Sequence, residues 1–173
     1  MQSKPGGEAT AARYSEIVED EFIRSSVDDD FVGVQSYTCT VFGPDGVIRN
    51  DLEESRTQMG WEYWPEALGQ AIRHASELSG GLPILVTENG IATDDDERRV
   101  AYTTGALKAL MHAMSDGIDV RGYLHWSLLD NYEWGSYGPT FGLVSWDPET
   151  FERTVKPSAL WLGDVARQRR LSA

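Results

Sequence analysis

Two carboxylates and a group of aromatic side chains are the residues of this sequence best suited to chemistry. Glu88 follows a short apolar run, and the segment from His125 to Trp134 also holds Trp126 and Glu133. A pyranose sugar stacks its C–H face on a flat ring, while its hydroxyls need charged or amide partners at fixed angles. These residue types therefore favour a carbohydrate as the ligand.

Gln35 and Tyr37 add an amide and a phenol to this group. Side chains alternate along a strand, so the two residues share a face and point toward the same ligand. A glycosidase can use two carboxyl groups, one as a protonated acid and one as an ionised nucleophile. Nothing in the sequence says which of Glu88 and Glu133 is protonated, so we do not pair them. A single Trp can also belong to the core, and Glu133 can cap a helix or form a salt bridge.

The elements that must position these residues alternate between helical and strand periodicity. Apolar residues recur at steps of three and four over residues 8–26, 65–79, 98–115 and 157–170, which predicts helices. Short runs rich in Val, Ile, Leu and Tyr predict strands over residues 31–38, 84–87 and 120–127. The residues between, 39–63 and 128–154, are expected to be long loops.

This alternation predicts an α/β fold with a parallel sheet and right-handed crossovers. In such folds the ligand binds beyond the carboxyl ends of the strands. The segments that follow these ends are residues 35–38, 88–90 and 126–134. They contain the amide, the phenol, both carboxylates and two of the indoles, so the predicted topology gathers the candidate residues at one edge of the sheet.

Composition narrows the class of partner. A chain of 173 residues corresponds to about one domain, and 15 Lys and Arg against 28 Asp and Glu give a net charge of −13. This acidic balance argues against a nucleic acid or an anionic membrane as partner. No apolar run reaches the ~18 residues of a transmembrane helix. Residues 1–7 lack a hydrophobic signal core and are expected to be a disordered leader, and we expect a cytoplasmic location.

Cysteine and histidine usage gives no sign of a disulfide framework or of a metal site. Cys39 is the single cysteine of the chain. The three histidines, His74, His112 and His125, lie far apart in the sequence and form no pair at metal-ligand spacing. We therefore expect neither a metal nor a cofactor.

Longer motifs contain the candidate residues and occur in a consistent order. They are DFVGV over residues 30–34, GWE over 60–62, LVTENG over 85–90, WSLLDNYEW over 126–134 and FGL over 141–143. With them the chain resembles the C-terminal portion of the family 1 glycoside hydrolases, which are retaining β-glucosidases on a (β/α)8 TIM barrel. The resemblance implies a partial barrel made of the last three strands, the sixth to the eighth. Residues 1–173 are then the C-terminal part of a single barrel domain.

The resemblance also implies catalytic roles at the first two strand ends. Glu88 is the nucleophile that attacks the anomeric carbon and forms a covalent glycosyl-enzyme. Tyr37 donates its phenol proton to that carboxylate, which orients it and keeps it ionised. Many relatives read Asn-Tyr where this chain has Gln35 and Ser36, so the amide here is longer by one methylene.

Binding roles are implied for five further residues. Trp126 is the platform under the sugar, and Glu133 accepts hydrogen bonds from the sugar's far hydroxyls with Trp134 beside it. Trp61 lines the leaving-group side, and Phe141 is a wall near the primary hydroxyl. Phosphosugar-cleaving members replace the Glu133 region, and a carboxylate there repels a 6-phosphate. We therefore expect an unphosphorylated β-glucoside, or a related galactoside or fucoside, as substrate.

The family's acid/base glutamate lies in a TFNEP motif that this sequence does not contain. A retaining mechanism needs that second carboxyl group, so we expect the chain alone to be inactive. Strands 31–37 and 120–127 are expected to be open edges that an N-terminal half or a homo-oligomer covers. The alternative is a non-catalytic carbohydrate-binding or interaction module derived from the same fold.

Overall fold

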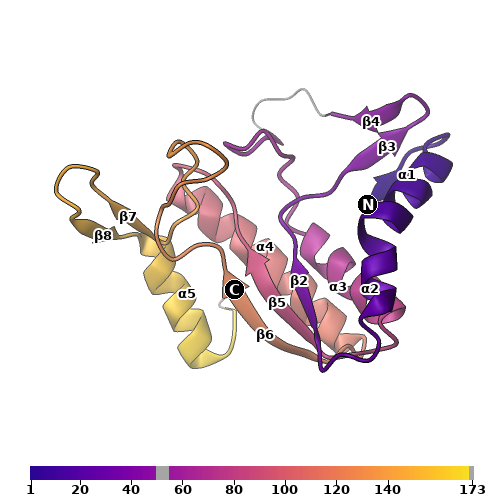
Figure 1. Cartoon of the computed structure of the whole chain (residues 1–173). Coiled ribbons are helices and arrows are strands. Elements are labelled where there is room, and N and C mark those ends of the chain that lie inside the picture. Colours follow the sequence, from indigo (N-terminus) through magenta and orange to yellow (C-terminus); the bar gives the residue numbers. More distant parts are fainter. Residues whose placement is uncertain (50–54, 172–173) are drawn as a thin grey trace.

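A three-stranded parallel sheet forms the centre of the protein (Figure 1). The computed structural model describes residues 1–49 and 55–171. The strand order is β2 (Val32–Gln35), β5 (Ile84–Asn89) and β6 (Val120–His125). The connections contain helices α3 (Ala67–Leu78) and α4 (Asp96–Ser115), as the sequence predicts for parallel crossovers.

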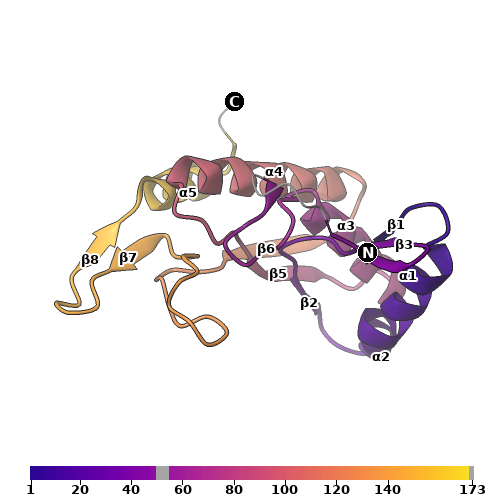
Figure 2. The ribbon, with the colours of Figure 1, turned by 90° about the horizontal axis from the view of Figure 1, so that it is seen from above.

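The helices cover one face of this sheet. Figure 2 shows α3, α4 and the last helix, α5 (Pro157–Gln168), on the same side of the strands. Along β2, Val32 and Val34 are buried under the helices, whereas Gly33 and Gln35 on the opposite face are exposed. The alternation of strand side chains thus separates a core face from an open face that leads to the strand ends.

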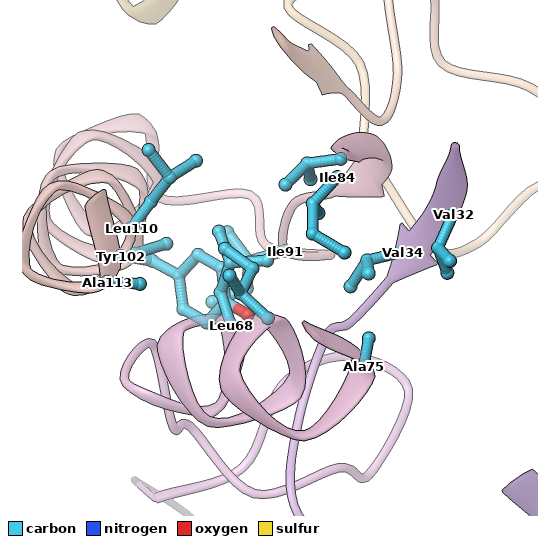
Figure 3. Packing of buried hydrophobic residues seen from close by; sticks show 12 residues of the cluster. Val32, Val34, Leu68, Ala75, Ile84, Ile91, Tyr102, Leu110 and Ala113 are labelled. Atoms are coloured by element: carbon cyan, nitrogen blue, oxygen red, sulfur yellow. The ribbon is translucent and has the colours of Figure 1, made fainter. Parts of the chain in front are cut away.

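The core lies between the sheet and helices α3 and α4 (Figure 3). Ile72 from α3 and Ile84 and Val86 from β5 are completely buried there. Asp95 begins α4, because its carboxylate accepts hydrogen bonds from the main-chain N–H groups of Glu97 and Arg98. Asp95 therefore caps the helix at its N-terminus.

The N-terminal segment differs from the sequence prediction. We expected residues 1–7 to be a disordered leader, but β1 (Gln2–Ser3) pairs in parallel with β3 (Val41–Gly43). The main-chain N–H of Lys4 donates to the carbonyl of Phe42 at 2.8 Å. Gly7 allows this contact, because a Cβ there would clash with the Phe42 carbonyl. Main-chain pairing thus orders a segment that has no apolar pattern of its own.

The helix predicted over residues 8–26 forms with an irregular middle. Helix α1 (Glu8–Ser15) continues through a π-helical turn (Glu16–Asp20) into α2 (Glu21–Ser25). The helical periodicity of the sequence is therefore confirmed, while the wider turn has no counterpart in that pattern.

Two short hairpins lie inside the predicted loops. Strand β3 pairs with β4 (Gly46–Ile48), and β7 (Val144–Trp146) pairs with β8 (Arg153–Val155). Each strand has three residues, which is too short for a recognisable period of two. Residues 50–54 of the first loop lie outside the described residues.

Both lateral edges of the central sheet lack a neighbouring strand among the described residues. Strands β2 and β6 each pair with β5 and with no other strand of that sheet, as the sequence leads us to expect. Across residues 1–49 and 55–171, none of the helices has the length and hydropathy needed to cross a bilayer.

Candidate active site

A cavity of about 430 Å³ lies at the carboxyl ends of the central strands. It is lined by the amide, the phenol, both carboxylates and four aromatic residues: Gln35, Tyr37, Trp61, Glu88, Trp126, Glu133, Trp134 and Phe141. These are the eight residues that the sequence singles out. Folding thus brings together residues that are up to 106 positions apart (35 to 141).

Glu88 is the penultimate residue of β5, and each of its carboxylate oxygens has a hydrogen-bond donor. Gln35 Nε2 donates to Oε1 at 3.0 Å, and the Tyr37 hydroxyl donates to Oε2 at 2.6 Å. Both donors come from the end of the neighbouring strand β2, as the shared strand face predicts. The arrangement suits an ionised carboxylate, since each oxygen accepts rather than donates. We call Glu88, Gln35 and Tyr37 the Glu88 corner.

The Tyr37 phenol remains a donor throughout the neutral pH range. Burial, followed by the hydrogen bond to Glu88, raises the pKa of Tyr37 well above its usual value. Its ring also packs against two others of the cavity, with centroids 5.6 Å from Trp61 and 5.8 Å from Phe141. Aromatic contacts on the ring and a carboxylate at the hydroxyl therefore fix both ends of this side chain.

Trp126 and Glu133 form the second polar pair of the cavity. The indole Nε1–H of Trp126 donates to Glu133 Oε1 at 2.8 Å, and Glu133 is only 7% exposed. A tight turn holds the loop here, because the main-chain N–H and carbonyl of Glu133 both bond to Ser136. Glu133 thus lies in a turn and does not cap a helix. The neighbouring Trp134 lies at the rim of the cavity and is 86% exposed.

Gly90 lets the ends of β5 and β6 approach each other. A Cβ at this position would clash with the carbonyl oxygen of Trp126. The main-chain N–H of Trp126 donates to the carbonyl of Asn89 at 2.9 Å, so the platform residue lies directly beside the end of β5. The glycine that follows Glu88 and Asn89 in the sequence is therefore required by a close main-chain contact.

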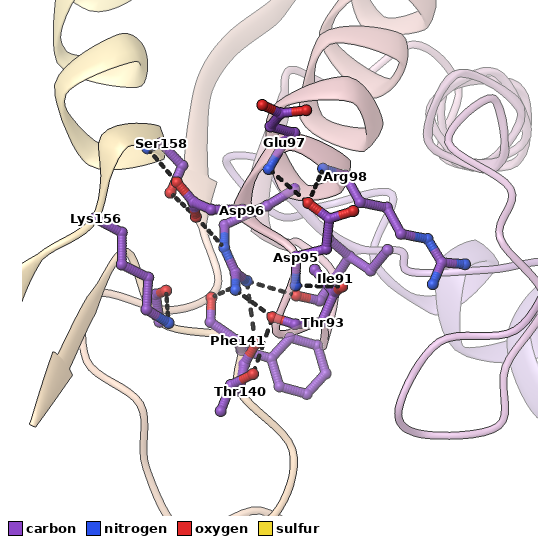
Figure 4. A network of polar contacts seen from close by, with 12 residues as sticks. Ile91, Thr93, Asp95, Asp96, Glu97, Arg98, Thr140, Phe141, Lys156 and Ser158 are labelled. Atoms are coloured by element: carbon purple, nitrogen blue, oxygen red, sulfur yellow. Dashed lines mark hydrogen bonds and ion pairs between the residues drawn. The ribbon is translucent and has the colours of Figure 1, made fainter.

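Phe141 lies on a long loop that the buried Arg99 holds in place through main-chain carbonyls. Figure 4 labels Thr140 and Phe141 on this loop, together with Ile91 and Thr93 from the segment after β5. Arg99 Nη1 lies 2.9 Å from the carbonyl of Ile91 and 3.1 Å from those of Thr140 and Phe141. Its Nη2 donates to the carbonyl of Thr93. The guanidinium is 1% exposed and joins the segment after β5 to the loop after β6. We call this set of contacts the Arg99 cluster.

Arg99 is not among the residues predicted from the sequence, although the sequence contains a signal for it. Arg99 shares one helical face with Tyr102, Thr103 and Ala106, all of which are buried. Spacings of three, four and seven residues define that face, so a charged residue stands within an apolar stripe. Such a charge is buried only when it is paired. Asp96 supplies a carboxylate oxygen 3.0 Å from Arg99 Nε.

A second polar contact closes the base of the same loop. Lys156 Nζ lies 2.9 Å from a carboxylate oxygen of Asp130 and 2.8 Å from the carbonyl of Gly142. Asp130 in turn accepts from the main-chain N–H of Gly142 at 2.7 Å. Burial lowers the pKa of Lys156, opposed by the hydrogen bond to Asp130. The loop that bears Glu133 and Phe141 is thus tied at two places.

One group of side chains in the described residues has metal-ligand spacing, and it lies outside the cavity. Glu19, Asp20 and His74 place a ligand atom each within 4.8 Å of the others. Asp20 already accepts hydrogen bonds from Ser15 at 2.8 Å and interacts with His74 Nε2 at 2.7 Å. These contacts account for the group as an ordinary polar cluster between the N-terminal helices and α3.

A parallel α/β sheet with a cavity at the carboxyl ends of its strands is the arrangement typical of part of a TIM barrel. The chain belongs to glycosyl hydrolase family 1, whose family model matches residues 14–171. The fold of this family is a TIM barrel, and the structure matches it.

Relatives of known name agree with this assignment. The chain is 38% identical over 155 residues to a β-galactosidase of Sulfolobus acidocaldarius and 33% identical over 153 residues to β-glucosidase A of Thermotoga maritima. Each match covers 80% of this chain. Its structure superposes on that of β-glycosidase BGL167 with a TM-score of 0.92 and 48% identity. A Thermotoga maritima β-glucosidase in complex with deoxynojirimycin superposes with a TM-score of 0.76 and 32% identity.

The chain spans only part of each relative. It covers 31% of the Sulfolobus β-galactosidase and 34% of the Thermotoga β-glucosidase. It covers 41% of BGL167, while 99% of this chain is matched. The matched region thus includes the whole cavity described above, and most of each relative lies outside it.

Proposed function

We propose that this chain is the C-terminal portion of a retaining β-glycosidase that cleaves unphosphorylated β-glucosides or closely related glycosides. Its central strands β2, β5 and β6 are then the sixth, seventh and eighth strands of the barrel. The Glu88 corner is the observation that carries the proposal: a carboxylate at a strand end has both oxygens held by donors, at 3.0 and 2.6 Å. Such a group is oriented for attack and pre-organised as an anion.

In the proposed reaction Glu88 attacks the anomeric carbon of the sugar. The bond from this carbon to the leaving-group oxygen breaks, and a covalent glycosyl-enzyme forms. Tyr37 and Gln35 hold the carboxylate in place before the attack. Water then breaks the new bond and restores the Glu88 carboxylate, so that the sugar leaves with its original anomeric configuration.

The remaining cavity residues are proposed to bind the sugar. Trp126 offers a ring face to the C–H side of the pyranose, and Glu133, already fixed by the Trp126 indole, accepts hydrogen bonds from sugar hydroxyls. Trp134 extends this surface at the rim. Phe141 and Trp61 enclose the opposite side, with ring centroids 6.3 Å apart.

The acid/base carboxyl group is proposed to come from outside this chain. A retaining enzyme places it about 5 Å from the nucleophile. Among the described residues that line the cavity, the second carboxylate is Glu133, and its Oε1 accepts from Trp126. We therefore expect the chain alone not to turn over ordinary glycosides. An N-terminal half, bound along the open edges of β2 and β6, is the proposed source of the missing group. A second copy would cover these edges but lacks the TFNEP motif.

An activated substrate tests the nucleophile without the acid. 2,4-Dinitrophenyl 2-deoxy-2-fluoro-β-glucoside carries a leaving group that departs without protonation, so attack by Glu88 alone can form the glycosyl-enzyme. We expect intact-protein mass spectrometry to show one added fluoroglucosyl group, and peptide mapping to place it on Glu88. The variant Glu88→Gln is the matched control and should remain unlabelled, while p-nitrophenyl β-glucoside should not be turned over by either protein.

Three results would count against parts of this proposal. A label on another side chain would reject Glu88 as the nucleophile. Binding of deoxynojirimycin by the folded chain without any labelling would favour a non-catalytic carbohydrate-binding module instead. Rapid turnover of p-nitrophenyl β-glucoside that depends on Glu88 would show that this chain supplies its own acid/base group.

A further inference from the structure

We infer that Asn89 and Tyr102 are positioning residues that hold Tyr37 against Glu88. The inference rests on the proposed role of Glu88 as the nucleophile. Neither residue lines the cavity, and both act through the main chain at the ends of the strands. Their side chains are buried, with exposed fractions of 0% for Asn89 and 1% for Tyr102.

Regular strand pairing is interrupted next to the Glu88 corner. The register between β2 and β5 shifts between Val34 and Gln35, and the register between β5 and β6 shifts between Val86 and Asn89. Beyond the first shift Gln35 pairs with Glu88, and the main-chain N–H of Ser36 donates to the carbonyl of Glu88 at 3.2 Å. Tyr37 lies one residue further along the chain, where buried side chains add their contacts to this pairing.

The side-chain amide of Asn89 supplies contacts to both neighbouring strands. Its Nδ2 donates to the carbonyl of Ser36 at 2.6 Å, and its Oδ1 accepts from the Tyr123 hydroxyl at 2.9 Å. The main-chain carbonyl of Asn89 also accepts from Trp126 N–H at 2.9 Å. A single buried residue thus joins the end of β2, through Ser36, and the end of β6 to the end of β5.

Tyr102 holds Tyr37, the residue after Ser36, from the helix side. Its hydroxyl donates to the main-chain carbonyl of Tyr37 at 2.6 Å and lies 3.5 Å from Asn89 Nδ2. Burial raises the pKa of Tyr102, so the hydroxyl stays a donor. Its ring packs edge-on against Tyr63 at a centroid distance of 5.5 Å. Helix α4 therefore sets the position of the Tyr37 main chain.

Consecutive carbonyls at the end of β2 are held in this way, that of Ser36 by Asn89 and that of Tyr37 by Tyr102. The side chain that extends from this fixed main chain reaches Glu88 with a hydrogen bond of 2.6 Å. Misplacing a catalytic group by about 1 Å can cost on the order of 100-fold in rate. Loss of either contact should thus slow attack by Glu88 more than it weakens sugar binding.

The test compares variants of the two positioning residues with a control variant in the core. Tyr102→Phe removes only the hydroxyl, and Asn89→Ser shortens the side chain that reaches Ser36. Ile72→Val is the control, because Ile72 is fully buried in the core and has no polar group. All variants are treated with the 2,4-dinitrophenyl fluoroglucoside below their unfolding temperatures, and the maximal labelling rate and the half-saturating concentration are measured separately.

We expect Tyr102→Phe and Asn89→Ser to lower the maximal labelling rate by about tenfold. The half-saturating concentration should change by less than about twofold, since the cavity lining is intact. Ile72→Val should label like the wild-type chain. The positioning role is rejected if Tyr102→Phe labels at the wild-type rate. It is also rejected if Ile72→Val lowers the maximal labelling rate as much as Tyr102→Phe does. Should Asn89→Ser not fold, Tyr102→Phe decides alone.

A proton NMR measurement separates this inference from the proposed function. The Tyr37 hydroxyl proton, held in a short bond to a carboxylate, should give a downfield signal that disappears in Tyr37→Phe. We expect the signal to shift or vanish in Tyr102→Phe and to persist in Ile72→Val. If these spectra are observed but the fluoroglucoside does not label the wild-type chain, Glu88 is rejected as the nucleophile and the positioning role of Tyr102 is kept. An unchanged signal in Tyr102→Phe would reject the positioning role.

Discussion

The two sides of the cavity are held together by different physical means. At the Glu88 corner, neighbouring parallel strands bring the residues together, and neutral side chains donate to one carboxylate. Phe141 comes from a loop, where the Arg99 cluster supplies a buried cation to main-chain carbonyls. The strand side therefore depends on several neutral contacts, and the loop side depends on buried charged residues, Arg99 and Lys156.

This difference determines how each side should fail. Removing one contact at the Glu88 corner leaves the sheet and the core intact. The effect should therefore be local and should lower the rate of attack by Glu88 rather than the stability of the fold. Removing the Arg99 guanidinium leaves the buried carbonyl of Ile91 without its side-chain donor and Asp96 without its cation. It also takes one donor from each of the other carbonyls of the Arg99 cluster. Unsatisfied buried groups cost far more than a lost hydrogen bond. The loop side should thus be more important for stability.

The largest effect is expected for Arg99→Met. We expect a loss of about 3 to 5 kcal/mol in the free energy of unfolding, because the variant breaks a buried ion pair and removes the cation that donates to the carbonyls of the Arg99 cluster. Urea unfolding followed by tryptophan fluorescence measures this quantity. Arg167→Met is the control, since Arg167 pairs with Asp164 at the surface with 71% of its side chain exposed. That control should lose less than about 1 kcal/mol. Equal losses in the two variants would remove the contrast between the two sides.

The same contrast explains which parts of the site are predictable from the sequence. Gln35, Tyr37 and Glu88 follow from strand alternation and from the rule that ligands lie at the carboxyl ends of parallel strands. Their partners lie on adjacent strands, so local patterns are sufficient to bring them together. The sequence predicts each strand of the central sheet and the helices that cover it for the same reason.

The loop side is not predictable in this way. Arg99 donates to carbonyls of residues up to 42 positions away, and main-chain carbonyls carry no sequence signal. Likewise β1 is ordered by pairing with β3 across about 40 residues, although residues 1–7 have no apolar pattern. Long-range contacts made by main-chain groups therefore account for the elements and the positioning residues that sequence reasoning missed.

A smaller, pH-dependent effect is expected at His125, which precedes Trp126 where the two sides meet. Burial, assisted by the Arg99 charge, lowers the pKa of His125 from 6.5 to about 4. The unfolded chain then binds a proton more readily than the folded one, so stability is lost as the pH falls from 6.5 to about 4. Over this window the wild-type chain should lose on the order of 2 to 3 kcal/mol more than His125→Gln. Urea unfolding at several pH values measures the free energy of unfolding of the two proteins. If this free energy depends on pH in the same way in both, the pKa of His125 is not lowered by folding.

Lys156→Met should have an intermediate effect on the loop side. Lys156 and Asp130 are less buried than Arg99, with side-chain exposures of 17% and 13%, and the lysine reaches a single main-chain carbonyl, that of Gly142. We expect a loss of about 2 kcal/mol in the free energy of unfolding. Arg121→Met, which removes an exposed pair with Asp119, serves as the comparison. A loss as large as that of Arg99→Met would show that the base of the loop matters as much as the Arg99 cluster.

The smallest effect on stability is expected for Trp134→Ala. Trp134 is 86% exposed at the rim of the cavity, so its truncation should change the free energy of unfolding by less than about 0.5 kcal/mol. A sugar ring that contacts the indole loses a stacking partner, and the dissociation constant for deoxynojirimycin should rise by about three- to tenfold. Phe22→Ala is the matched control, because Phe22 is 70% exposed on α2, away from the cavity. Titration calorimetry with both variants decides: equal affinities would place Trp134 outside the sugar-binding surface, whereas a selective loss would extend that surface to the rim.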